Sequence, residues 1–69
     1  MSVTEITEGQ VYTVTFPRGM AKTDFNKCLR MARRYGCFSA GSWTIQVTGG
    51  LVASCVREMI DRGADVDRI

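Results

Sequence analysis

Histidine is absent from this chain of 69 residues, and proline and tryptophan each occur only once. Without histidine, and without two acidic side chains close together in an apolar stretch, the sequence has no evident means of tuning a pKa for acid–base catalysis. The three cysteines, Cys28, Cys37 and Cys55, are odd in number and lack CxxC spacing, which argues against a disulfide framework or a zinc site. We therefore expect a non-enzymatic protein without cofactor or metal, whose cysteines are reduced, half-buried thiols in the cytoplasm.

Long apolar runs are also absent. The longest uncharged stretch, residues 35–56, is interrupted by glycines and polar side chains, so it does not predict a membrane-spanning helix. Residues 1–10 have neither a basic start nor an apolar run, which argues against a secretory signal. Hydrophobic residues make up 45% of the chain and charged residues 23%, as in ordinary globular proteins. We expect one domain over residues 1–69, with residues 1–9 flexible.

Hydrophobic periodicity predicts a strand followed by an amphipathic helix in the first half of the chain. Residues 11–16 alternate with a period of two and are rich in β-branched and aromatic side chains, which is typical of a strand. A helix is expected over residues 24–35, with Thr23 as its N-cap and Gly36 where a left-handed helix end is most favourable. The side chains expected on the core side of these elements are Tyr12, Val14, Phe16, Phe25, Cys28, Leu29, Ala32 and Tyr35.

The second half of the chain predicts a hairpin and a second helix. Residues 36–40 and 43–47 flank Gly41-Ser42, a short glycine-containing connection of the kind that joins antiparallel strands. A helix is expected over residues 51–62 because apolar side chains recur there at helical spacing. The apolar positions of this half are Trp43, Ile45 and Val47 in the hairpin and Val52, Cys55, Val56, Met59 and Ile60 in the helix.

The predicted order of elements is β-α-β-β-α, and residues 64–69 add an optional edge strand through Val66 and Ile69. Two amphipathic helices need an apolar sheet face to cover, and the strands offer one. We therefore predict a single α+β domain with an antiparallel sheet and both helices on one face, either ferredoxin-like or a truncated variant of that arrangement.

Positive charge is concentrated in one segment. The net charge of the whole chain is only +2, but residues 18–34 hold six basic side chains against one acidic side chain, Asp24. At 100° per residue, most of the basic side chains in the first helix lie opposite its apolar side. The candidate binding residues are Lys22, Lys27, Arg30, Arg33 and Arg34, with Arg18 and Trp43 as further candidate interface residues.

This basic helix face has three interpretations. It is an ordinary solvated surface, a contact for the phosphates of a nucleic acid, or a contact for an acidic protein surface, because one positive field attracts either partner. The outward positions of the sheet, Thr13, Thr15, Ser39, Thr44 and Gln46, lack the aromatic side chains on which RNA-recognition modules stack bases. Trp43 is the one residue that could change this conclusion, if it is exposed at the edge rather than buried in the core.

The residues Tyr35-Gly36-Cys37-Phe38, Gly41-Ser42 and Trp43-Thr44-Ile45 carry a resemblance. The segment over residues 25–47, about a third of the chain, resembles the HARP domain of annealing helicases, a module that binds DNA structures, although the usual acidic turn of that family is missing. By size, composition and basic helix, the chain is also similar to small phage-encoded proteins that block host machinery, including anti-CRISPR proteins.

The leading functional hypothesis is a small accessory protein that binds a nucleic-acid backbone through the first helix without reading its sequence. The competing hypothesis is an inhibitor, phage-encoded or from another mobile element, that docks on a host protein through the same helix or the hairpin. A structural or oligomerisation module is the third.

Overall fold

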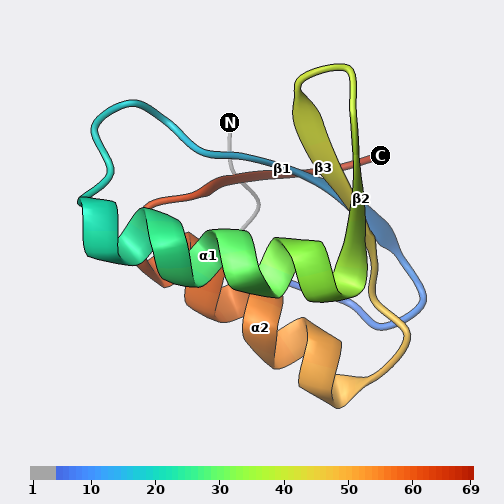
Figure 1. Ribbon diagram of the computed structural model, residues 1–69. Helices are drawn as coiled ribbons and strands as arrows, with labels where there is room; N and C mark the ends of the chain where they lie inside the picture. Colours follow the sequence, from blue (N-terminus) through green and yellow to red (C-terminus); the bar gives the residue numbers. More distant parts are fainter. Residues whose placement is uncertain (1–4) are drawn as a thin grey trace.

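A computed structural model describes residues 5–69 of the chain. A four-stranded antiparallel sheet has the strand order β2-β3-β1-β4, and two helices cover one of its faces (Figure 1). The elements are β1 (Val11–Thr15), α1 (Lys22–Tyr35), β2 (Gly36–Ser39), β3 (Ser42–Gln46), α2 (Gly50–Asp61) and β4 (Asp65–Arg68). The predicted α+β fold is confirmed, and the optional last strand is present, so the order β-α-β-β-α-β is that of the ferredoxin-like arrangement.

The predicted core face of the sheet is also confirmed. Tyr12 lies opposite Ile45, and Val14 lies between Trp43 of β3 and Val66 of β4. Tyr12, Val14, Ile45 and Val66 are at most 1% exposed, because they face the helices. Side chains of the opposite parity face away from the helices, as alternation along a strand requires.

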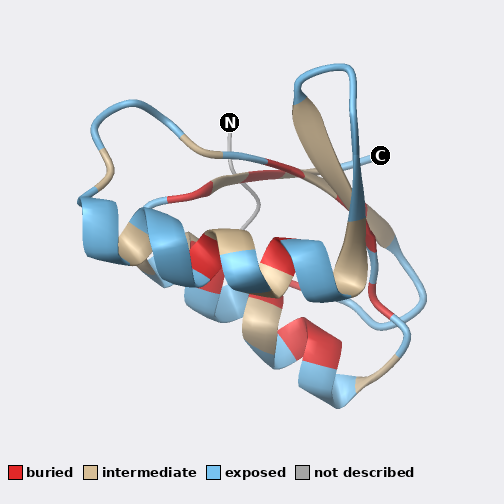
Figure 2. Cartoon of the chain, viewed as in Figure 1, coloured by how far each residue is buried: buried red, intermediate tan, exposed pale blue. Residues whose placement is uncertain are grey.

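Each helix packs an apolar stripe against this sheet, as the periodicity predicted (Figure 2). In α1 the buried residues are Cys28 and Ala32; in α2 they are Val52, Ala53, Val56 and Met59. The stripe of α1 is only partly covered, because Leu29 is half-buried and Phe25 remains 37% exposed. One flank of the first helix therefore leaves apolar surface open.

Two predicted features at the ends of α1 are wrong. The helix begins at Lys22 with Ala21 in the N-cap position, so Thr23 lies inside the first turn and does not cap it. Gly36 is not left-handed: its φ of −132° and ψ of 177° make it the first residue of β2. A Cβ at Gly36 would lie 2.7 Å from both Ile45 Cγ1 and Thr44 O, so glycine is required there by lack of space.

The hairpin turn lies one residue earlier than predicted. Ser39 pairs with Ser42, which leaves Ala40 and Gly41 as the two connecting residues. Their φ values are 52° and 84°, and two successive residues with positive φ give the twist that a two-residue hairpin favours. Alanine tolerates this conformation poorly, which is why the sequence pattern placed the turn at the glycine and the serine after it.

The helices are also joined by a polar contact. Arg62 Nη1 donates to Asp24 Oδ1 at 2.8 Å, and Arg62 Nε donates to Glu58 Oε2 at 3.2 Å. The hydrogen bond that Arg62 donates to Asp24, followed by the one that it donates to Glu58, raises the pKa of Arg62 further above its ordinary range. Arg62 is half-buried against α1. The one acidic side chain of the basic segment is therefore already neutralised within the fold.

The cysteines differ more from one another than predicted. Cys28 is buried, Cys55 is intermediate and Cys37 is exposed on β2, so the half-buried state expected of all three holds only for Cys55. Burial raises the pKa of the Cys28 thiol above its ordinary value of 9.0, and the positive charge of Arg62 opposes part of that rise.

The segment before β1 is attached to the domain from residue 6 onward. Ile6 is 5% exposed, its carbonyl accepts a hydrogen bond from Arg57, and Gly9 N donates to Val47 O at 2.7 Å. The expected flexibility of residues 1–9 stays a prediction, and residues 1–4 lie outside the described part. At the other end Val66 is buried but Ile69 is 72% exposed, so of these two only Val66 joins the core. No helix within residues 5–69 is long and apolar enough to cross a membrane.

Candidate functional site

All six basic residues of the 18–34 segment are exposed. Within residues 5–69 none of them forms an ion pair with a carboxylate, since Asp24 is bound by Arg62. Arg34 lies over the ring of Tyr35, with its Cζ atom 5.7 Å from the ring centroid. The segment therefore presents cations that the described part of the fold leaves uncompensated.

These cations fall into two groups around α1. Arg33 lines a groove between α1 and the β2–β3 hairpin, and Arg18 and Lys22 line an adjoining hollow. Lys22 and Arg33 are eleven residues apart, which returns them to within about 20° of each other after three helical turns. The other three cations, Lys27, Arg30 and Arg34, lie outside both hollows.

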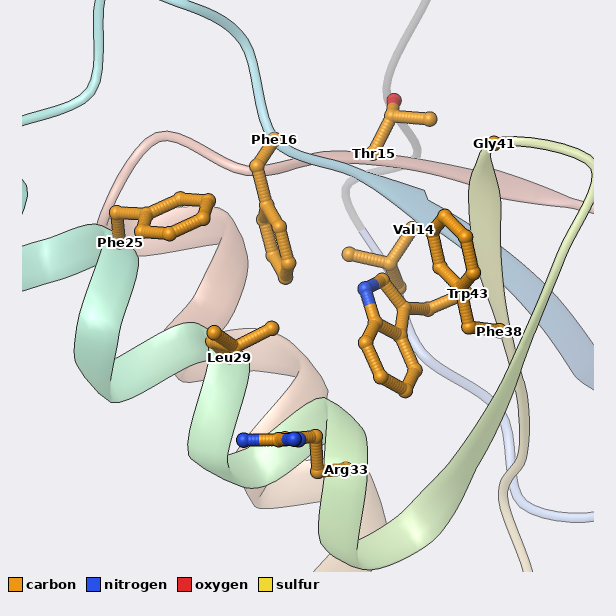
Figure 3. A pocket seen from close by; sticks show the side chains of 9 residues that line it. All are labelled: Val14, Thr15, Phe16, Phe25, Leu29, Arg33, Phe38, Gly41 and Trp43. Carbon is orange, nitrogen blue, oxygen red and sulfur yellow. The ribbon is translucent and has the colours of Figure 1, made fainter.

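The groove beside Arg33 is open, apolar and largely aromatic, with a volume of about 510 Å³ (Figure 3). Two pairs of rings form its opposite sides. Phe16 and Phe25 meet edge to face with ring centroids 5.4 Å apart, and Phe38 and Trp43 lie 5.2 Å apart on the hairpin. We call this hollow the aromatic groove.

The aromatic groove exists because α1 leads into β2 without an intervening loop. Tyr35 is the last residue of the helix and Gly36 is the first residue of the strand. Figure 1 shows β2 rising away from the end of α1, so the space between helix and hairpin widens toward the turn at Ala40 and Gly41. The rings at the hairpin stay partly solvated, with Phe38 61% exposed.

Trp43 lies between the core and the aromatic groove. It is half-buried and packed against the core, yet it also lines the aromatic groove together with Phe38. Phe25 and Phe38 were not among the predicted binding residues. The sequence contained a signal for Phe38. A two-residue turn at Ala40 and Gly41 places Phe38 directly opposite Trp43 on the same face of the sheet, where the two rings can form one surface.

The opposite face of the sheet is polar, as predicted. Thr13 lies between Thr44 on β3 and Asp67 on β4, and Thr15 lies opposite Asp65. No aromatic side chain belongs to this face within the described strands, so a base-stacking platform like that of RNA-recognition modules is absent there. Among residues 5–69 no group of three or more potential metal ligands comes together.

Comparison with models of known protein families, with curated proteins and with solved structures found no match for this chain. The assignment of a function therefore depends on the chemistry of the surface itself.

Proposed function

We propose that this chain is a small binding protein that contacts the phosphate backbone of a nucleic acid through the basic side of α1. The observation that carries the proposal is the row of exposed cations of residues 18–34, none of which is paired with a carboxylate in the described part of the chain. Because phosphate contacts release condensed counterions and need no base contact, such a row favours backbone binding without sequence recognition.

The distribution of the remaining charge supports the same partner. The carboxylates of α2 and β4, such as Glu58, Asp61 and Asp65, belong to elements other than α1. The only acidic side chain of α1, Asp24, is bound by Arg62, so the surface of α1 that an anion approaches carries mainly cations. The positive field of such a surface also raises the rate of association with a polyanion.

The test compares two variants that have the same net charge. Replacing Arg30 and Arg34 together by glutamine lowers the net charge of +2 to zero, and Arg68→Glu on β4 does the same. Binding to a labelled oligothymidylate and to a duplex of equal length is followed by fluorescence anisotropy over a range of salt concentration. Circular dichroism checks that both variants remain folded, since exposed substitutions change the free energy of unfolding by only about 0.5 kcal/mol each.

We expect the glutamine pair to weaken binding and to lower the slope of log affinity against log salt. Each phosphate contact contributes about 0.7 to that slope on single strands, so two lost contacts remove about 1.4. Arg68→Glu should leave the slope unchanged. Equal effects of the two variants would show that net charge alone matters and would refute α1 as the contact surface.

The alternative of an inhibitor that docks on a host protein predicts a different result. An acidic protein surface would stay bound after nuclease treatment and would depend less steeply on salt than a polyanion does. If the wild type binds neither oligonucleotide but keeps a protein partner after nuclease treatment, the nucleic-acid proposal is wrong and docking on a protein takes its place.

A further inference from the structure

We infer that the aromatic groove receives an unpaired base of a single strand whose phosphates lie on α1, so that the ligand class is single-stranded nucleic acid. This inference rests on the proposed function and adds a second kind of contact to it. Its basis is the position of Arg33 in the lining of the aromatic groove, with Arg18 and Lys22 in the adjoining hollow.

The first argument is the exposure of the rings. Phe38 is 61% exposed and Phe25 is 37% exposed, although both belong to the side of the fold that faces the core. Within residues 5–69 no segment covers the space between them. Proteins that bind single strands place accessible aromatic rings where bases can stack, and such stacking tolerates any sequence because every base has a π face.

The second argument is charge complementarity. The linings of the aromatic groove and of the adjoining hollow contain no acidic side chain and carry Arg33, Arg18 and Lys22. The two hollows share Phe16 and Phe25, so apolar and cationic surface are continuous. A ligand that matches this surface has a flat apolar group for the aromatic rings and a negative charge for the neighbouring cations. A nucleotide has both, in its base and its phosphate.

The third argument is shape. The groove is bounded by Phe16 and Phe25 on one side and by the hairpin rings on the other, and Val14 and Leu29 also line it (Figure 3). Aromatic walls favour stacking with a planar ring, while the lining offers few polar groups to a peptide backbone. In a duplex the bases are stacked and paired, and moving one of them into the groove would cost the free energy of unstacking and unpairing it. A single strand, whose bases are already unpaired, is therefore favoured.

The test uses Trp43, the only tryptophan of the chain, as an internal reporter. Intrinsic fluorescence is recorded while the wild type is titrated with an oligothymidylate of about 12 nucleotides, a duplex of the same length, and an abasic oligomer with the same phosphate backbone. We expect the oligothymidylate to change the Trp43 emission, and the abasic oligomer to bind in a salt-dependent way without that change.

The matched variants are Phe38→Ala and Leu51→Ala, since both remove an exposed apolar side chain, 61% and 69% exposed respectively. Phe38→Ala should weaken binding of the oligothymidylate roughly 5- to 140-fold, the loss expected for one base–aromatic stack. It should leave binding of the abasic oligomer unchanged. Leu51→Ala, at the start of α2, should affect neither ligand.

The outcomes separate this inference from the proposed function. If all three oligomers bind with steep salt dependence, the Trp43 emission stays constant and Phe38→Ala binds like the wild type, the inference is refuted while backbone binding stands. If no oligomer binds, both are refuted, and a protein segment becomes the occupant to test. The wild-type emission alone decides the case if Phe38→Ala does not fold.

Discussion

Replacing Gly36 by alanine is the sharpest test of how the aromatic groove is built. The added Cβ would lie 2.7 Å from Ile45 Cγ1, 2.7 Å from Thr44 O and 3.2 Å from Ala32 O. Ile45 is fully buried and Thr44 O belongs to the backbone of β3, so neither atom can move aside freely. The helix end must therefore shift away from the sheet.

The size of the effect follows from two opposing contributions. Overpacking a well-filled core costs about 1–3 kcal/mol. Alanine also has less conformational freedom than glycine in the unfolded chain, which raises the free energy of unfolding by about 0.4–1 kcal/mol. We expect a net loss of about 1–2 kcal/mol, which lowers the Tm of a domain of this size by about 5–15 °C.

The assay is urea unfolding followed by the fluorescence of Trp43, together with thermal unfolding by circular dichroism. Gly50→Ala is the matched control, because a Cβ at this position of α2 meets no atom within 4 Å and the substitution should raise stability by about 0.5 kcal/mol. If Gly36→Ala is as stable as the wild type, the junction between α1 and β2 is not close-packed, and our explanation of the groove is wrong.

Four further outcomes can be measured. Cys37 should react with a thiol reagent at once and Cys28 only slowly, because only Cys28 is buried. Because burial raises the folded pKa of Cys28 above 9.0, its contribution to stability is present below pH 9.0 and is lost as the pH rises through the folded pKa. The wild type should therefore lose stability above pH 9.0, and Cys28→Ala should lose less. Ala40→Asn should raise the free energy of unfolding by about 0.5–1 kcal/mol, because asparagine accepts a φ of 52° better than alanine. Asp24→Asn should destabilise the domain at low salt by breaking the contact with Arg62, and less so at about 0.5 M salt, where partly exposed ion pairs are screened.

The sequence predicted the elements well because each has a clear periodicity. The alternation of residues 11–16 and the apolar spacing of α2 are properties of a local window, and the structure confirms both. The last strand was only an option, since four residues with a single buried side chain, Val66, give too short a pattern. Its pairing with β1 comes from tertiary structure.

The errors concern positions whose conformation depends on distant neighbours. A glycine after a helical pattern is typical of a helix end. At Gly36, however, glycine is required because Ile45 and Thr44 of another strand leave no space for a side chain. Ala40 adopts a positive φ that no residue-type rule assigns to alanine. Local patterns do not contain such constraints.

The candidate site was predicted in part. All the basic residues named from the sequence are exposed, because charge and helical spacing are local features. The aromatic groove could not be predicted from spacing, since Phe25 and Leu29 have the periodicity of core residues. They stay partly open because β2 diverges from α1, and that angle is a property of the assembled fold.

The position of β1 between β3 and β4 has a consequence for the order in which the domain forms during synthesis. The register brings Tyr12 opposite Arg68 and Thr15 opposite Asp65, so one edge of β1 is paired by β4, which is synthesised after the other described elements. A ribosome-bound chain without residues 65–68 therefore carries β1 with unpaired backbone groups beside an apolar face. Such an edge is open to pairing with other nascent chains, and pairing with the last strand closes it.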